Sequence, residues 1–174
     1  KAFAQVRSTI PSDEAQAKSL QLTKEVYGQE WEDAKKSAEK QALATKLLQR
    51  ARESTDGTNR YVLLKVARDI ATQAGDAELA FKTIDVMASR YDVDAYKLKG
   101  AALSQAAKSV TSSAHSIALA KLSLALVDQA VEKDDFVAAK YLGGLAMDAA
   151  RKAREYTLTK QIVARNVEVN EIAK

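Results

Sequence analysis

The sequence predicts an all-α fold built from antiparallel helical hairpins, and three observations carry this expectation. Apolar residues recur at three- and four-residue steps along almost the whole chain, whereas the two-residue alternation of a strand is nearly absent. The 174 residues include one proline and six glycines, so few positions interrupt a helix. Alanine fills about a fifth of the chain, which favours helices that pack closely on one another.

Capping residues divide the chain into seven or eight expected helices, because the free amides of a first turn need a short side-chain acceptor. The first helix runs toward Gly28 and then continues or kinks through 29–36, and 54–59 is a polar loop. Residues 1–11 form an N-terminal extension, and 12–174 form a single helical-repeat domain. The expected helix starts are Ser12, Ser37, Arg60, Asp76, Asp92 or Asp94, the segment 111–113, Asp134 or Asp135, and Thr157.

An internal similarity favours a stack of repeats. A shift of 79 residues places Leu63 on Leu142, Ala67 on Ala146 and other apolar positions of two successive helices on one another. Half of this shift is close to the length of common helical repeats. The expected architecture is therefore a tetratricopeptide-like α-solenoid or an irregular bundle. The full Trp, Gly, Tyr and Pro signature of tetratricopeptide repeats is absent.

Two expectations concern packing. The apolar helix at 117–131 should be the most buried. Gly143 and Gly144 interrupt an apolar helix, where each glycine costs roughly 1 kcal/mol relative to alanine. Close backbone approach of a neighbouring helix is the expected reason for both, and a ligand contact is the alternative.

The composition offers few candidate residues for catalysis or for metal binding. The chain has no cysteine and one histidine, so a Ser-His-Asp arrangement would need His115, which lies at an expected helix start. Three pairs of adjacent carboxylates are expected to offset the free amides of first turns, since neighbouring residues on a helix point in different directions. These pairs are Asp13 with Glu14, Glu32 with Asp33, and Asp134 with Asp135. We therefore predict no catalytic residue, no metal site and no cofactor.

Charge and hydropathy narrow the class of partner. The net charge is +4, but basic and acidic residues balance along most of the chain, and only 151–174 is locally basic. A basic stretch without interleaved aromatics is weak evidence for nucleic acid, which is not expected as a partner. No stretch approaches the roughly 20 apolar residues of a membrane helix, so membrane insertion is not expected either.

Aromatic residues are the candidate binding residues. Trp31, Tyr61, Tyr96 and Tyr141 could line the concave face of a helical stack, where rigid aromatic rings commonly anchor a peptide. The alternative is that these rings cover the ends of hairpins with their hydroxyl groups in water.

Several segments resemble a helical region that recurs in large multidomain bacterial proteins of the planctomycete type. They are NRYVLLKVARDIATQAGD at 59–76, AFKTID at 80–85, RYDVD at 90–94, VYGQEW at 26–31, KQALATKLL at 40–48 and AVEKDDFVAA at 130–139. The resemblance covers nearly the whole chain from about Pro11. It implies an exported or surface-associated context, and it attaches no enzymatic activity to this region.

The expected function is a non-catalytic scaffold or protein-interaction module of a larger, exported multidomain protein. Its partner would be a protein, a peptide or a flanking domain of the same chain. The alternative is an accessory domain of a carbohydrate-active protein that contacts polysaccharide through Trp31 and the tyrosines.

Overall fold

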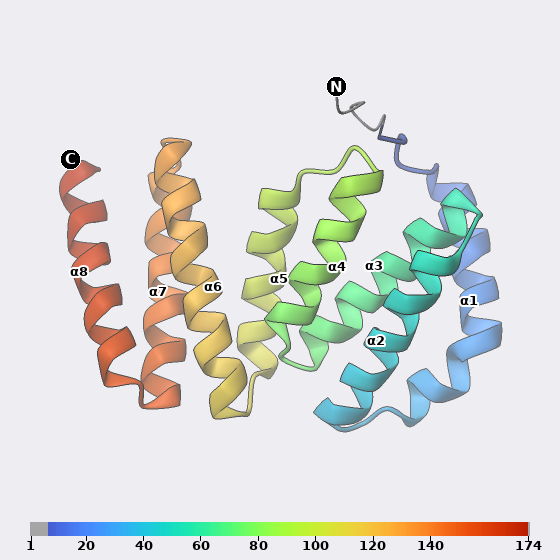
Figure 1. Cartoon of the computed structure of the whole chain (residues 1–174), viewed down its shortest axis with the longest axis horizontal. Coiled ribbons are helices and arrows are strands. Elements are labelled where there is room, and N and C mark those ends of the chain that lie inside the picture. Colours follow the sequence, from blue (N-terminus) through green and yellow to red (C-terminus); the bar gives the residue numbers. More distant parts are fainter. Residues whose placement is uncertain (1–6, 174) are drawn as a thin grey trace.

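The computed structural model describes residues 7–173, and this part of the chain forms eight α-helices joined by short connections (Figure 1). The helices are α1 (Asp13–Asp33), α2 (Ser37–Glu53), α3 (Gly57–Gln73), α4 (Ala77–Arg90), α5 (Ala95–Ser109), α6 (Ser113–Glu132), α7 (Phe136–Ala153) and α8 (Tyr156–Ile172). The predicted all-α fold is confirmed.

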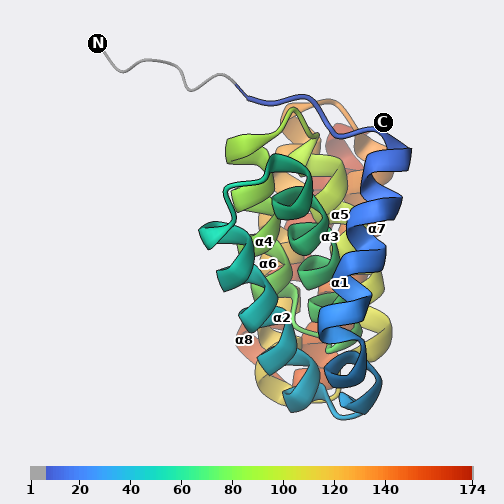
Figure 2. The ribbon, with the colours of Figure 1, turned by 90° about the vertical axis from the view of Figure 1, so that its right-hand side faces the viewer.

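The helices run up and down in two layers and form one elongated stack. Odd-numbered helices lie in one layer and even-numbered helices in the other, as the view along the stack shows (Figure 2). Within the described residues, helices pack on their next and next-but-one neighbours along the chain, and a side-chain contact between Gln41 of α2 and His115 of α6 reaches farther. The stack therefore has two distinct ends, one at α1 and one at α8 (Figure 1).

Five helix starts are capped by residues that the sequence predicts. Ser12, Asp76, Asp94, Ser112 and Asp135 each accept a hydrogen bond from the amide three residues on. Three predicted starts are wrong by one to three residues. Ser37 is the first residue of α2 rather than its cap, α3 begins at Gly57 after its cap Asp56 instead of at Arg60, and α8 begins at Tyr156 after Glu155 instead of at Thr157.

The start of α2 uses a different acceptor. The Glu39 carboxylate accepts from the backbone amides of Lys36 at 2.8 Å and of Lys35 at 2.9 Å. These bonds favour the charged form and lower the pKa of Glu39. The Ser37 hydroxyl is thereby free to donate to the carbonyl of Ala74, 2.6 Å away on the neighbouring α3–α4 turn.

The first helix continues past Gly28 to Asp33, which is one of the two expected alternatives. Two further expectations about local structure need correction. The loop expected at 54–59 shortens to 54–56 because α3 begins at Gly57. Glu32 and Asp33 lie in the last turn of α1 and not in a first turn. The other two carboxylate pairs do lie at helix starts.

The described part of the N-terminal extension crosses the α4–α5 connection. The Ser8 amide donates to the Arg90 carbonyl at 2.8 Å, and the Asp92 amide donates to the Ser8 carbonyl at 2.9 Å. These two bonds form an isolated parallel bridge between Ser8 and Tyr91, which attaches the extension to the end of α4. Residues 1–6 of the predicted extension lie outside the described residues.

The most buried helix is α3, which corrects the expectation for 117–131. Nine of the 17 residues of α3 are buried, compared with seven of the 20 residues of α6. The reason is position, because α3 contacts α1, α2, α4 and α5 and so has neighbours on most sides. Leu122 and Leu124 of α6 are only partly buried.

The 79-residue similarity coincides with helix boundaries. The shift carries α3 onto 136–152 and α4 onto 156–169, which are nearly the bounds of α7 and α8. Ala67 and Ala146 are both fully buried, and so are Ala71 and Ala150. We call α1–α4 the first unit and α5–α8 the second unit.

An inter-helix hydrogen bond also recurs in the two units. Ser37 of α2 donates to the carbonyl of Ala74 at the end of α3, and Ser113 of α6 donates to the carbonyl of Ala153 at the end of α7, at 3.4 Å. This agreement supports the predicted internal repeat, which stays a prediction.

The two adjacent glycines of α7 have different surroundings. A Cβ atom on Gly143 would lie 2.1 Å from Asn166 Oδ1 of α8, whose amide donates to the Gly143 carbonyl at 3.2 Å. A Cβ atom on Gly144 would meet nothing within 4 Å. Close approach of α8 therefore explains Gly143, although the approaching group is the Asn166 side chain and not the backbone. At Gly144 nothing approaches closely, so the expected close approach is wrong there.

Alanine substitutions should separate these two glycines. We expect Gly144→Ala to raise the free energy of unfolding by up to about 1 kcal/mol, because alanine lowers the entropy of the unfolded chain. Gly143→Ala should show no such gain, because Asn166 must move and lose its hydrogen bond, which costs about 1–2 kcal/mol and offsets the gain from alanine. Urea denaturation measures both changes. Equal effects of the two substitutions would contradict this account.

Candidate binding grooves

The structure places Tyr61 in the core, so it is not a surface anchor. Its side chain is 8% exposed and packs edge-on against Tyr91, with ring centroids 5.0 Å apart and an interplanar angle of 75°. The Tyr91 hydroxyl donates to the Gly57 carbonyl at 2.6 Å, which joins the end of α4 to the start of α3. Burial disfavours the phenolate and raises the pKa of both tyrosines.

Trp31 borders a groove between α1 and α3. This α1–α3 groove, with a cavity volume of about 360 Å³, includes Ala17, Leu20, Trp31, Val62 and Val66. The Trp31 ring is partly buried and packs against the core of the first unit. One part of the ring borders this groove, and another part borders a shallow cavity beside Lys24 and Gly28.

Tyr96 and Tyr141 meet at a second groove, between α5 and α7. This α5–α7 groove has a volume of about 240 Å³, and its lining includes Tyr96, Gly100, Ala101, Ala138 and Tyr141. The two tyrosines come from different helices, and the small residues between them leave room for an inserted side chain. The structure thus brings together two of the four predicted aromatic residues.

Polar contacts hold these two tyrosines in place. The Tyr141 hydroxyl donates to Ser104 Oγ at 3.1 Å, and the Tyr96 hydroxyl lies 3.5 Å from Asp135 Oδ2. Lys133 Nζ lies 5.5 Å from the centroid of the Tyr96 ring. Burial, together with the Asp135 carboxylate, raises the pKa of Tyr96, so its phenol is neutral at pH 7.

The two grooves occupy corresponding places in the two units. Each separates neighbouring helices of the odd-numbered layer, and the shift of 79 residues carries Val62 of one lining onto Tyr141 of the other. The second groove therefore has an aromatic residue where the first has an aliphatic one. Tyr141 is 54% exposed, so its ring is accessible.

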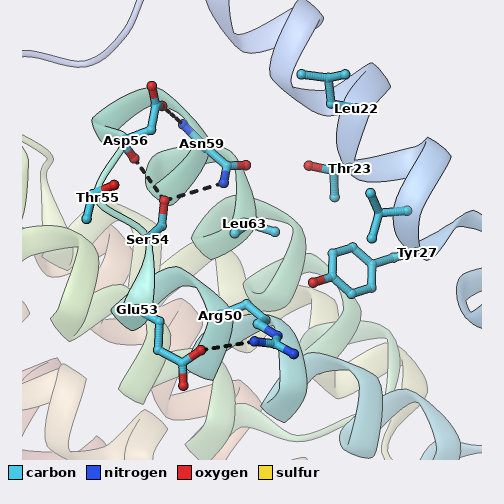
Figure 3. Close-up of a pocket in the computed structure, with 11 residues that line it drawn as sticks. Leu22, Thr23, Tyr27, Arg50, Glu53, Ser54, Thr55, Asp56, Asn59 and Leu63 are labelled. Carbon is cyan, nitrogen blue, oxygen red and sulfur yellow. Dashed lines mark hydrogen bonds and ion pairs between the residues drawn. The ribbon is translucent and has the colours of Figure 1, made fainter.

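A larger cavity of about 520 Å³ lies between α1 and the α2–α3 connection (Figure 3). Leu22, Thr23 and Tyr27 extend from α1 on one side, and the paired Arg50 and Glu53 lie on the other, with their charged atoms 3.2 Å apart. No sequence motif predicts this cavity. It forms because α1 packs mainly on α3 and contacts α2 sparsely.

His115 joins three helices at one edge of the stack. It lies in the first turn of α6, as expected, with its amide bonded to Ser112 Oγ. Its Nε2 atom lies 2.8 Å from Gln41 Nε2 of α2, which also donates to Asp76 Oδ2 at 3.0 Å. Because the Gln41 amide is a donor in both contacts, His115 Nε2 acts as the acceptor.

The described residues show neither a metal-ligand cluster nor a membrane-spanning helix. Within residues 7–173, no three His, Asp or Glu side chains gather closely enough to hold a metal ion. No helix in the same part of the chain is long and apolar enough to cross a membrane.

Comparison with protein-family profiles, curated proteins and solved structures found no match to this chain.

Alanine substitutions should distinguish core from groove tyrosines. Tyr61→Ala should lower the free energy of unfolding by about 3–5 kcal/mol, as for other large aromatics removed from a core. Tyr141→Ala should change it by less than about 1 kcal/mol, because its ring is largely exposed and loses one exposed hydrogen bond. Thermal or urea unfolding measures both. A mild effect at Tyr61 would contradict its assignment to the core.

Proposed function

We propose that this chain is a non-catalytic scaffold that binds a peptide segment of a protein partner, or of a flanking domain, in the α5–α7 groove. The observation that carries the proposal is that Tyr96 of α5 and Tyr141 of α7 line one groove. Small residues (Gly100, Ala101, Ala138) and two leucines (Leu126, Leu142) share its lining. Aromatic rings that need little additional ordering are common anchors of protein interfaces. Their existing hydrogen bonds reduce the entropy that binding would cost.

The shape and charge of this groove suggest the chemistry of its partner. Its volume of about 240 Å³ suits one large apolar side chain inserted between the tyrosines. The charged residues of its lining are Lys97 and Asp135, whereas Lys99 pairs with Asp85 of α4 at 2.7 Å. A peptide with a leucine or aromatic residue beside an aspartate or glutamate that reaches Lys97 fits this lining, since opposite charges favour encounter and register.

An exported or surface-associated context remains part of this proposal, and the resemblance to the planctomycete-type region is its support. The polysaccharide hypothesis has less structural support. It needs Trp31 as an open platform for sugar rings, whereas Trp31 packs partly against the core. That hypothesis therefore becomes one outcome of the binding experiment.

Selection from a phage library of random twelve-residue peptides tests the proposal. The recovered peptides should combine one large apolar residue with neighbouring acidic residues. Binding of one labelled selected peptide should weaken by about tenfold or more in Tyr141→Ala, which corresponds to about 1.4 kcal/mol. Gly100→Leu, which fills the floor of the groove, should have a similar effect.

Tyr156→Ala is the matched control, because Tyr156 is an exposed tyrosine on α8, 82% exposed, away from the groove. It should bind the peptide like the unmodified chain. Failure to select any peptide whose binding depends on Tyr141 would overturn the proposal. Retardation in a polysaccharide affinity gel that is lost in Trp31→Ala would instead support the carbohydrate alternative.

A further inference from the structure

We infer that the α8 end of one copy of this chain packs against the α1 end of a second copy, in a head-to-tail contact that resembles the junction between the two units. This inference concerns the ends of the stack and does not depend on the groove proposed above. It rests on residues that are buried at the internal junction and exposed at the ends.

The junction between the units shows how two such ends fit together. On the first unit, α4 contributes Ala77, which packs in the core of the second unit, and Ile84, which belongs to the core of the first unit; they are 1% and 0% exposed. On the second unit, α5 presents Leu98 and Ala102, and both pack into the core of the first unit. Contacts of α5 with α3 and α4, and of α6 with α4, complete this junction.

The α8 end has the surface that α4 uses at this junction. The shift of 79 residues carries Ala77 onto Tyr156 and Ile84 onto Val163. Tyr156 is 82% exposed and Val163 is 46% exposed, so apolar positions that are buried on α4 are uncovered on α8. Val167, one helical turn after Val163, is also exposed and extends this apolar surface.

The α1 end has the surface that α5 uses. The recurring serine hydrogen bond aligns Ser37 with Ser113, a shift of 76 residues. The same shift carries Leu22 onto Leu98 and Val26 onto Ala102. Leu22 and Val26 are 61% and 69% exposed on α1, one turn apart on the same face. The two ends are therefore counterparts of the two sides of one existing interface.

Charge makes the two ends complementary. In the last turn of α1, Glu32 and Asp33 place negative charge where it is unfavourable for the helix itself, and with the lysines that follow, residues 29–36 carry a net charge of −1. At the turn between α7 and α8, residues 151–155 carry a net charge of +2, and Lys152 donates to the carbonyl of Val110. Both segments lie at the same edge of the stack (Figure 1), so a second copy in the same orientation brings opposite charges together.

The contact between copies would differ from the internal junction at one corner. Gly75 has a φ of +75°, and a Cβ atom there would lie 2.7 Å from the Val110 backbone of α5. Its counterpart is Arg154, with a φ of +60°. The larger side chain keeps the second copy farther away at this corner, and its guanidinium can reach the carboxylates at the end of α1.

Such a contact joins unlike surfaces, so it does not close on itself as a two-fold dimer does. Repeating it produces open chains whose length rises with concentration. Sedimentation velocity at low salt, from about 5 µM to about 1 mM, should therefore show a weight-average mass that rises steadily above 18.9 kDa. The association should weaken in about 0.5 M salt because the ionic contribution is screened.

Variants that block one end each provide the decisive test. Val163→Glu blocks the α8 end, and the double variant Leu22→Glu with Val26→Glu blocks the α1 end. Each should be a monomer alone, and an equimolar mixture should form a dimer of one of each, because one junction remains intact. Gln129→Glu, an exposed position on α6 in the middle of the second unit, is the control and should associate like the unmodified chain.

Circular dichroism of each variant checks that the fold is retained, as expected for exposed positions. Two results would overturn the inference. One is an unmodified chain that stays monomeric across the concentration range. The other is association that persists in either single-end variant, which would indicate a two-fold contact through one surface or a contact elsewhere.

Discussion

Close approach of helices through alanine is the constraint on which the rest of this structure depends. Ala67 and Ala71 on α3, and Ala146 and Ala150 on α7, are fully buried. They lie in the two cores, on helices that belong to the most extensive helix pairs of the stack, α2–α3 and α6–α7. A larger side chain at any of these positions would push the helices apart. The helices would then lose dispersion contacts in the interior.

Neighbour-only packing follows from this arrangement and leaves accessible surfaces. A stack in which each helix packs mainly on its next and next-but-one neighbours does not enclose a large central core. It instead leaves grooves between successive odd-numbered helices and an uncovered surface at each end. The proposed functions use these features, with a peptide in the α5–α7 groove and a second copy at the ends.

Local chemistry made the helices predictable, whereas burial was harder to predict. Capping by Asp76, Asp94 and Asp135 is determined within four residues, so the sequence shows it directly. Whether Tyr61 lies in the core or on the surface depends on the position of Tyr91, thirty residues away, which periodicity does not report. The sequence also failed to show that α3 is more buried than α6. Burial depends on how many helices surround each one, and periodicity does not report this number either.

Part of the candidate binding site could be chosen from the sequence. Because few rings occur in the chain, Trp31, Tyr96 and Tyr141 could be selected as candidates, but the same reasoning also selected the buried Tyr61. That Tyr96 and Tyr141 share one groove depends on the contact between α5 and α7, which no local pattern contains. The cavity beside α1 was not predictable, because it results from the sparse contact between α1 and α2.

Urea unfolding of Ala67→Leu and Ala146→Leu tests the central claim most directly. These residues correspond across the two units, and each is fully buried where helices approach. Each substitution should lower the free energy of unfolding by about 1–3 kcal/mol, because the interface cannot accommodate three additional carbon atoms without moving a helix. Ala125→Leu, at an exposed position of α6, should leave it nearly unchanged. Unchanged stability in either buried variant would contradict close packing through alanine.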